Sequence, residues 1–223
     1  MNFKINNTLI ISPHPDDETL GVGGSIKRFT DNNITVSILV VCAHMPPLYS
    51  EKEYKQTIDE AKNAFEKLGV KNYKFLNVPA TKINELPHAD LNKMISNFLN
   101  EVKPDTVFLP FPDRHIDHKI VFESSIVACR PNRSDAPTKV FLYETVSETH
   151  WNVFGAEHTF VPDFFINIDE TINDKITAFD CYKSQNQNTQ SRSTETIEAL
   201  AKFRGSQNGC KYAEAFKVAR IVI

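Results

Sequence analysis

Residues 8–19, "TLIISPHPDDET", lead from an apolar run into a loop with one histidine and three consecutive acids. The run "TLIIS" is β-branched and almost continuously apolar, as a strand covered on both faces tends to be. Apolar side chains at helical spacing follow over residues 19–30, and a second apolar run spans 34–43. The order strand, polar loop, helix, strand predicts the start of a parallel α/β sheet.

The same alternation continues along the rest of the chain. Further strands are predicted at 73–78, 106–110, 139–144 and 164–168, and further helices at 51–68, 90–101, 119–129, 169–183 and 194–204. The polar stretch "KSQNQNTQSRST" (183–194) is expected to be a surface loop. No internal repeat and no long linker interrupts the pattern. We therefore expect a single domain over residues 1–223, with a Rossmann-like, mostly parallel sheet and helices on both faces.

Composition narrows the class of protein. A net charge of −3 gives no reason to expect a nucleic-acid-binding face. The four cysteines lie far apart, which favours reduced thiols in a cytoplasmic protein over a disulfide framework. The N-terminus lacks the pattern of a signal peptide, and the apolar run at 34–43 is about half of the ~20 residues that a membrane span requires.

Two polar loops follow predicted strands at the same edge of the sheet. They are "PHPDDE" (13–18), after the first strand, and "PFPDRHIDH" (110–118), after the fourth. Ligands of open parallel sheets bind outside the carboxyl ends of the strands. The side chains expected to meet there are His14, Asp16, Asp17, Glu18, Asp113, Arg114, His115, Asp117 and His118. Mixed imidazole and carboxylate ligands suit zinc, although two histidines and one carboxylate could also hold Fe²⁺.

Simpler interpretations account for single features only. One acid after "HP" could cap the next helix, but a cap does not need three acids and a histidine. The glycines of "GVGGS" (21–25) do not match G-x-G-x-x-G, so close packing of a helix on the sheet explains them better than a nucleotide. The other histidines form no motif, and each is expected to be a surface or hydrogen-bonded residue; they are His44, His88, His150 and His158.

The paired motifs "PHPDDE" and "DRHIDH" resemble those of the PIG-L/LmbE-like zinc-dependent N-deacetylases. The resemblance continues at "EAKNAFEKLGV" (60–70), at "INIDETINDKITAFDCYKSQ" (166–185) and in the C-terminal stretch 204–216. It departs from the family at Ile116, where proline is usual. It also departs shortly before the segment that starts at Glu60, where an arginine is common and "YKQTIDEA" (54–61) offers only Lys55.

The resemblance implies a role for each matched residue. The zinc ligands would be His14, Asp17 and His118. Asp16 would be the general base and His115 the general acid or oxyanion stabiliser. Asp117 would orient His115 and raise its pKa. Arg114, the basic side chain of the same loop, is the candidate for substrate binding.

The activity that the resemblance implies is hydrolysis of an N-acetyl group on an amino sugar or sugar conjugate, with a zinc-activated water attacking the amide carbonyl. The expected partner is therefore a small acetylated sugar, with no nucleic acid and no membrane span; a homo-oligomer is left open. Two alternatives remain. One is an amidase acting on a larger N-acyl or thiol conjugate. The other is a sugar- or nucleotide-binding protein that keeps the fold without the chemistry.

Overall fold

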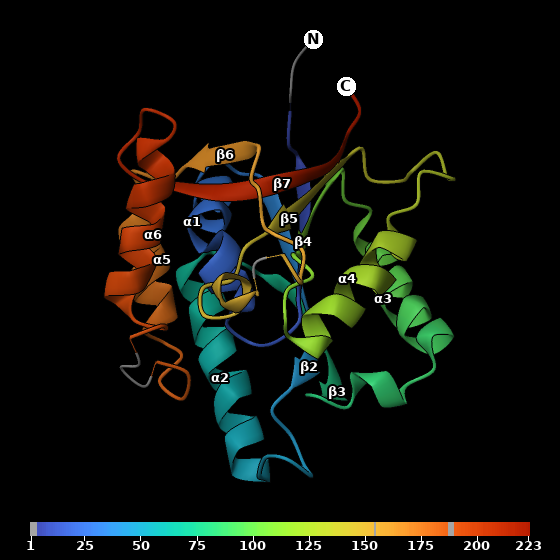
Figure 1. Ribbon diagram of the computed structural model, residues 1–223. Coiled ribbons are helices and arrows are strands. Elements are labelled where there is room, and N and C mark those ends of the chain that lie inside the picture. The colour runs from blue at the N-terminus through green and yellow to red at the C-terminus, as the bar shows by residue number, and fades with distance from the viewer. Residues whose placement is uncertain (1–3, 154, 187–189) are drawn as a thin grey trace.

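The computed structural model describes residues 4–153, 155–186 and 190–223, whose strands form one seven-stranded sheet (Figure 1). The strands are β1 (Asn7–Ser12), β2 (Thr35–Ala43), β3 (Asn72–Pro79), β4 (Thr106–Pro110), β5 (Lys139–Tyr143), β6 (Phe164–Asn167) and β7 (Ala213–Ile221). Their order is β3-β2-β1-β4-β5-β7-β6. The first five strands are parallel, and β7 runs antiparallel to both β5 and β6. The mostly parallel sheet is confirmed.

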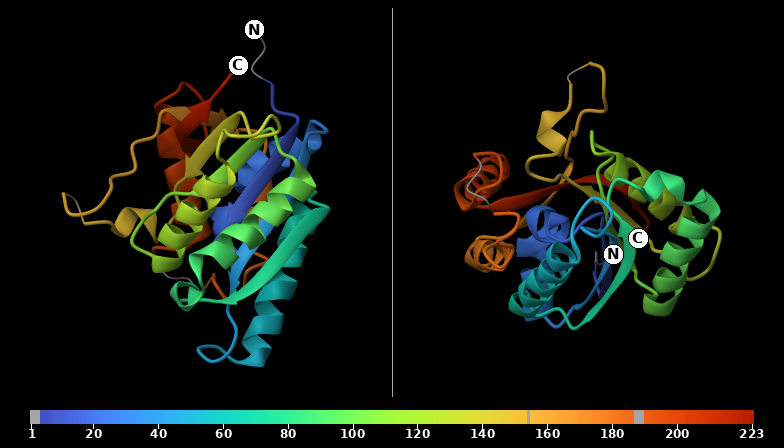
Figure 2. Two further views of the ribbon diagram at one scale, coloured as in Figure 1. Left: turned by 90° about the vertical axis from the view of Figure 1, so that its right-hand side faces the viewer. Right: turned by 90° about the horizontal axis from the view of Figure 1, so that it is seen from below.

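Helices cover both faces of the sheet, as expected. The α-helices are α1 (Asp17–Asp31), α2 (Glu51–Lys67), α3 (His88–Val102), α4 (Ile116–Ala128), α5 (Ile172–Phe179) and α6 (Thr194–Ser206), and the 3₁₀ turns are η1 (Ile83–Glu85) and η2 (Thr149–Trp151). One layer holds α1, α2, α5 and α6, and the other holds α3 and α4 (Figures 1 and 2). Strand β1 contributes Ile10 to the core under the first layer, and Leu9 and Ile11 to the core under the second.

The C-terminal strand β7 was not predicted. Its buried half contains Ala213, Glu214 and Ala215, and alanine and glutamate are residues that strands generally disfavour. Glu214 is buried because its carboxylate accepts a hydrogen bond from Lys175 Nζ at 2.6 Å and others from backbone N–H groups of α1 at 2.8 and 2.9 Å. An ion pair satisfied in this way lets a charged residue occupy a buried strand.

Helix α1 lies close to the sheet at Gly21. A Cβ atom there would lie 2.2 Å from Cδ2 of Tyr143, so a larger residue would displace the ring. The Tyr143 hydroxyl in turn donates to the backbone carbonyl of Ile11 at 2.9 Å. This contact confirms the packing role of the glycines in "GVGGS" and fixes the start of α1 against the carboxyl end of β1.

In the described parts of the chain, none of the helices is both long enough and apolar enough to cross a membrane. All four cysteines are free thiols.

Candidate active site

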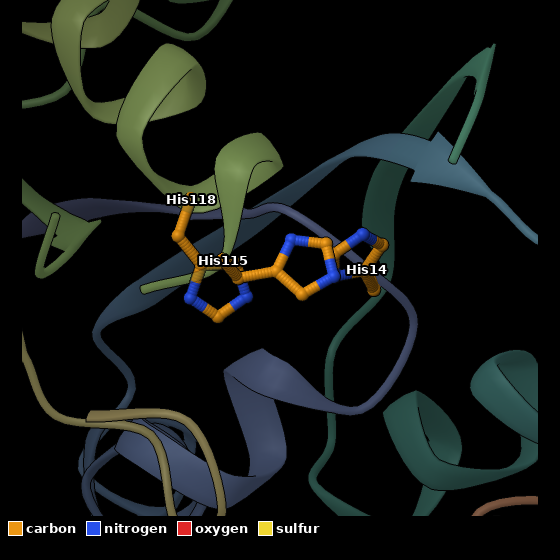
Figure 3. Close-up of side chains that lie close together, drawn as sticks. All are labelled: His14, His115 and His118. Atoms are coloured by element: carbon orange, nitrogen blue, oxygen red, sulfur yellow. The ribbon is translucent and has the colours of Figure 1, made fainter. Parts of the chain in front are cut away.

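A pocket of about 180 Å³ opens at the carboxyl ends of β1, β2 and β4. The loop after β1 contributes His14, and the start of α4 contributes His115 and His118. Their three imidazole rings gather at one point (Figure 3). The two polar loops that the sequence placed on one edge of the sheet therefore do meet.

One oxygen of Asp17 lies between two of these rings. Its Oδ2 atom is 3.1 Å from Nδ1 of His14 and 3.2 Å from Nε2 of His118. Ligand atoms held at about 2.1 Å by a tetrahedral ion lie about 3.4 Å apart, so these two distances to Asp17 are close to those within a zinc ligand set.

Each of the two histidines is anchored by a further buried carboxylate. Nε2 of His14 lies 2.8 Å from Asp117 Oδ2, and Nδ1 of His118 lies 3.0 Å from Asp113 Oδ2. Histidines that bind a metal commonly direct their second ring nitrogen to a carboxylate in this way, which fixes the tautomer and the ring orientation. The other ring nitrogen of each histidine then faces Asp17.

The charges of this cluster support one another. Burial lowers the pKa of His14, but the hydrogen bonds with Asp117 and Asp17 outweigh it and raise that pKa to about 9. Burial also opposes the charge of His118, yet Asp17 and Asp113 hold its pKa well above the ordinary value. Burial opposes the charge of Asp17 as well, and the two histidines hold its pKa well below the usual range. Asp17 thus favours the charged forms of the two histidines, and they favour the charged form of Asp17.

A divalent metal would fit these residues better than protons do. Nε2 of His118 is buried and has no hydrogen-bond partner among the described residues, although Asp17 Oδ2 is only 3.2 Å away. An unsatisfied buried nitrogen beside a carboxylate is what a missing ligand leaves behind. Ring nitrogens of His14, His115 and His118 also lie within 4.8 Å of one another, as do ligand atoms of a second group, His14, Cys42 and Asp117.

Asp16 does not cap α1. It is the residue before the helix, but its side chain makes no cap hydrogen bond, and its φ of 120° is rare for a residue other than glycine. Glu18 supports this backbone by accepting a hydrogen bond from Asp16 N at 3.2 Å and one from Tyr182 OH at 2.5 Å. Strain of this kind persists where the surroundings hold it in place, and it is common at active sites.

The Asp16 carboxylate instead faces the pocket. Its Oδ2 atom accepts a hydrogen bond from Nη1 of Arg192 at 3.1 Å. Burial, with the charges of Asp17 and Glu18, raises the pKa of Asp16 to about 7, although Arg192 opposes the shift.

The expected pairing of Asp117 with His115 is not present. The Asp117 carboxylate bonds to His14 and accepts a hydrogen bond from Thr81 N at 2.8 Å. Only the backbone N–H of Asp117 reaches His115, donating to Nδ1 at 3.2 Å, because His115 caps the first turn of α4. Burial, with His14 and His118 nearby, lowers the pKa of His115 to about 4. In this structure the Asp117 carboxylate therefore anchors His14, and not His115 as the expected pairing had it.

Arg114 lies apart from the pocket. Its side chain is about half exposed, donates to Trp151 O at 3.2 Å and lies 3.7 Å from Glu157. It is not among the described residues that line the pocket, whereas Arg192 is. Arg192 comes from the stretch 183–194, which was expected to be a surface loop; residues 187–189 of that stretch lie outside the described residues.

His44 also belongs to the pocket, contrary to expectation. It follows β2, stacks on His14 with ring centroids 6.0 Å apart, and contacts Gln185 Nε2 at 3.3 Å. Burial and the nearby His14 lower its pKa to about 4. The strand-end rule that identified the other two loops could have identified this one, since β2 ends at Ala43. No comparable signal marks Arg192.

Comparison with known proteins places the chain in a family. The family described as "PIG-L: GlcNAc-PI de-N-acetylase" matches residues 9–129, which hold both polar loops. The chain belongs to the PIG-L family. The identification made from "PHPDDE" and "DRHIDH" is confirmed.

Relatives of this PIG-L chain match most or nearly all of its length. A diacetylchitobiose deacetylase of Thermococcus kodakarensis is 28% identical over 97% of this chain and 87% of its own. A probable N-acetyl-alpha-D-glucosaminyl L-malate deacetylase 2 of Bacillus cereus is 26% identical over 80% of this chain and 83% of its own. The structure of the conserved protein TT1542 from Thermus thermophilus shares the fold, with a TM-score of 0.78, 23% identity, and coverage of 98% and 97% of the two chains.

Proposed function

We propose that this protein is a metal-dependent amide hydrolase that removes the N-acetyl group from an amino sugar or sugar conjugate. The observation that carries the proposal is the Asp17 oxygen between His14 and His118, with the Asp16 carboxylate facing the same pocket. The two relatives named above are deacetylases of acetylated amino sugars by name, and this supports the substrate class.

The metal would be held by His14, Asp17 and His118. Zinc is the proposed ion because two imidazoles and one carboxylate leave the open position that a catalytic zinc site requires; Fe²⁺ is the alternative. When bound, such an ion supplies Lewis acidity at the amide carbonyl and lowers the pKa of water.

Asp16 is the proposed general base. It would take a proton from the water whose oxygen adds to the acetyl carbonyl carbon, and the C–N bond then breaks as the nitrogen gains a proton. Arg192, 3.1 Å from the Asp16 carboxylate, keeps that group turned to the pocket. Arg192, and not Arg114, is therefore the arginine to which we assign a role in the pocket.

His115 is proposed as the oxyanion stabiliser rather than as a charged acid. Its Nδ1 accepts a backbone hydrogen bond, so in the neutral ring the proton is on Nε2. A neutral N–H donor of this kind can stabilise the negative charge that develops on the carbonyl oxygen. The amine proton would then come from Asp16, which received it from water.

The alternatives lack a supporting observation of this kind. A sugar- or nucleotide-binding protein has no need of a strained, buried carboxylate such as Asp16. An amidase for a larger acyl group remains the runner-up, since the chemistry would be the same.

We also propose that residues 1–223 act as one domain, because both polar loops belong to one sheet. We further propose that the four free thiols reflect a cytoplasmic location.

The test is acetate release from N-acetylglucosamine and N,N′-diacetylchitobiose by purified, chelator-treated and zinc-restored protein. We expect release in the purified and restored samples only. No acetate from either sugar after zinc is restored would contradict the proposal. Adding longer N-acyl sugars and a thiol conjugate to the substrates tested would distinguish a deacetylase from the runner-up, an amidase that acts on larger conjugates.

A further inference from the structure

A second hollow adjoins the active-site pocket. It measures about 390 Å³ and shares His44, Tyr49 and Gln185 with the pocket. Sites for small molecules usually exceed about 300 Å³, so the pocket of about 180 Å³ is small by itself. The two spaces together have the size of a site for more than one sugar ring.

The walls of the hollow suit a sugar. The Tyr49 ring packs against His44 with centroids 4.6 Å apart, giving an aromatic surface for the C–H face of a pyranose. On the first turns of α2, Gln56 presents an amide whose Nε2 donates to Glu60 at 2.9 Å. The Tyr49 hydroxyl and the Gln56 amide offer hydrogen bonds to sugar hydroxyls without requiring charge on the ligand.

The charge of the hollow is negative. Glu53 lines it, and hydrogen bonds from the backbone and side chain of Ser50 hold the pKa of Glu53 below its ordinary value. The described residues that line the hollow include no lysine or arginine. Lys55 is exposed on α2 and is not among them. Arg192 lines the adjoining pocket, but it is bonded to Asp16 and Gln185.

We propose that this hollow binds the remainder of the substrate, and that the substrate is an N-acetylated amino sugar joined to a neutral second sugar rather than to an acid. The inference rests on the proposed deacetylase function. It separates two kinds of conjugate that relatives of this chain are named for, a disaccharide and a malate.

The test compares kcat/KM for N-acetylglucosamine, N,N′-diacetylchitobiose and N-acetylglucosaminyl malate. We expect at least a tenfold preference for the disaccharide over the malate conjugate. Glu53→Gln should raise kcat/KM for the malate conjugate about threefold, as for removal of an exposed like charge. Glutamine can still complete the capping box with Ser50, so α2 should start unchanged.

Glu51→Gln is the matched control. It removes the same charge from the same first turn of α2, but Glu51 is not among the described residues that line the hollow. It should leave the ratio of the two substrates unchanged. Gln56→Ala should lower kcat/KM for the disaccharide about fivefold more than for the monosaccharide, the size of one lost hydrogen bond.

Two results would overturn the inference: a wild-type kcat/KM for the malate conjugate that equals or exceeds that for the disaccharide, or the same ratio of these two values in Glu53→Gln and Glu51→Gln. In either case, release of acetate would still support the proposed function. If no substrate released acetate, calorimetric binding of the same three sugars to the Asp16→Asn protein would decide. Tighter binding of the disaccharide, weakened by Gln56→Ala, would support the hollow; equal binding of all three would overturn it.

Discussion

The side of the pocket that we propose to face a metal (the metal-facing side) and the side that we propose to face the substrate (the substrate-facing side) are built differently. On the metal-facing side Asp17, Asp113 and His118 are at most 1% exposed, and each contacts another member of the cluster. On the substrate-facing side Tyr49 is partly exposed and Glu53 is exposed. The first side comes from the ends of central strands, whereas the second comes from the loop after β2 and the surface of α2.

This difference separates chemistry from specificity. A buried cluster in which each group satisfies another tolerates few changes, because removing one partner leaves a buried charge unpaired. Exposed side chains on a helix and loop can change at low cost in stability. Members of one family can therefore keep the same hydrolytic centre while they bind different sugar conjugates.

The largest expected effect is on the metal-facing side. His118→Ala should reduce bound metal from about one ion per chain to nearly none, because one of three protein ligands is lost. Metal content by mass spectrometry is the measurement. His88→Ala, which removes an exposed histidine at the start of α3, is the control and should keep its metal. If both variants kept the metal content of the wild type, His118 would not be a metal ligand, and the distinction between the two sides of the pocket would fail.

Asp16→Asn should keep the metal but lower kcat by about a hundredfold or more, since an amide cannot accept the proton that a general base takes. Steady-state kinetics on N,N′-diacetylchitobiose, together with metal content, gives both readouts. Turnover near that of the wild type would show that Asp16 has a structural role and that another group is the base.

Asp117→Asn and Asp113→Asn should each weaken metal binding about 10- to 100-fold, because each anchors a proposed ligand histidine. Competition with a fluorescent chelator measures the change in Kd. Had Asp117 acted on His115 as the sequence suggested, its variant would lower kcat without changing the metal Kd.

Beside the proposed general base, Arg192→Ala should lower kcat/KM roughly tenfold, as expected for loss of the hydrogen bond that it donates to the charged Asp16. Arg114→Ala is the matched control, and its effect should stay within about twofold because exposed substitutions away from a site change little. The reverse order of the two variants would return Arg114 to the role that the sequence gave it.

The last effect concerns pH and the metal-free protein. His14 has a pKa of about 9 in the folded chain against an ordinary value of 6.5. Its contribution to stability is therefore complete below pH 6.5 and is lost as the pH rises through 9. Thermal melting between about pH 6 and pH 10 should show a falling Tm. The fall should be smaller in Asp117→Asn, and equal slopes would remove Asp117 as the partner of His14.

The sequence was informative where local patterns decide the structure. Apolar runs located the parallel strands. Because ligands of a parallel sheet bind at the carboxyl ends of its strands, His14 and His118 could be predicted to lie close together although they are 104 positions apart in the sequence. It was uninformative where tertiary contacts decide. Strand β7 depends on the Glu214–Lys175 pair, and the position of Arg192 depends on Asp16, 176 residues away. The expected partner of Asp117 was wrong because its carboxylate bonds to His14 and to the backbone of Thr81, and the spacing of the motif shows neither contact.

The most direct test of the metal centre is an anomalous difference map at the zinc edge from crystals of the zinc-loaded protein. We predict one peak about 2.0–2.2 Å from Asp17 Oδ2 and from one ring nitrogen each of His14 and His118. A peak at the other cluster, between Cys42 and Asp117, or no peak within reach of Asp17, would contradict the account.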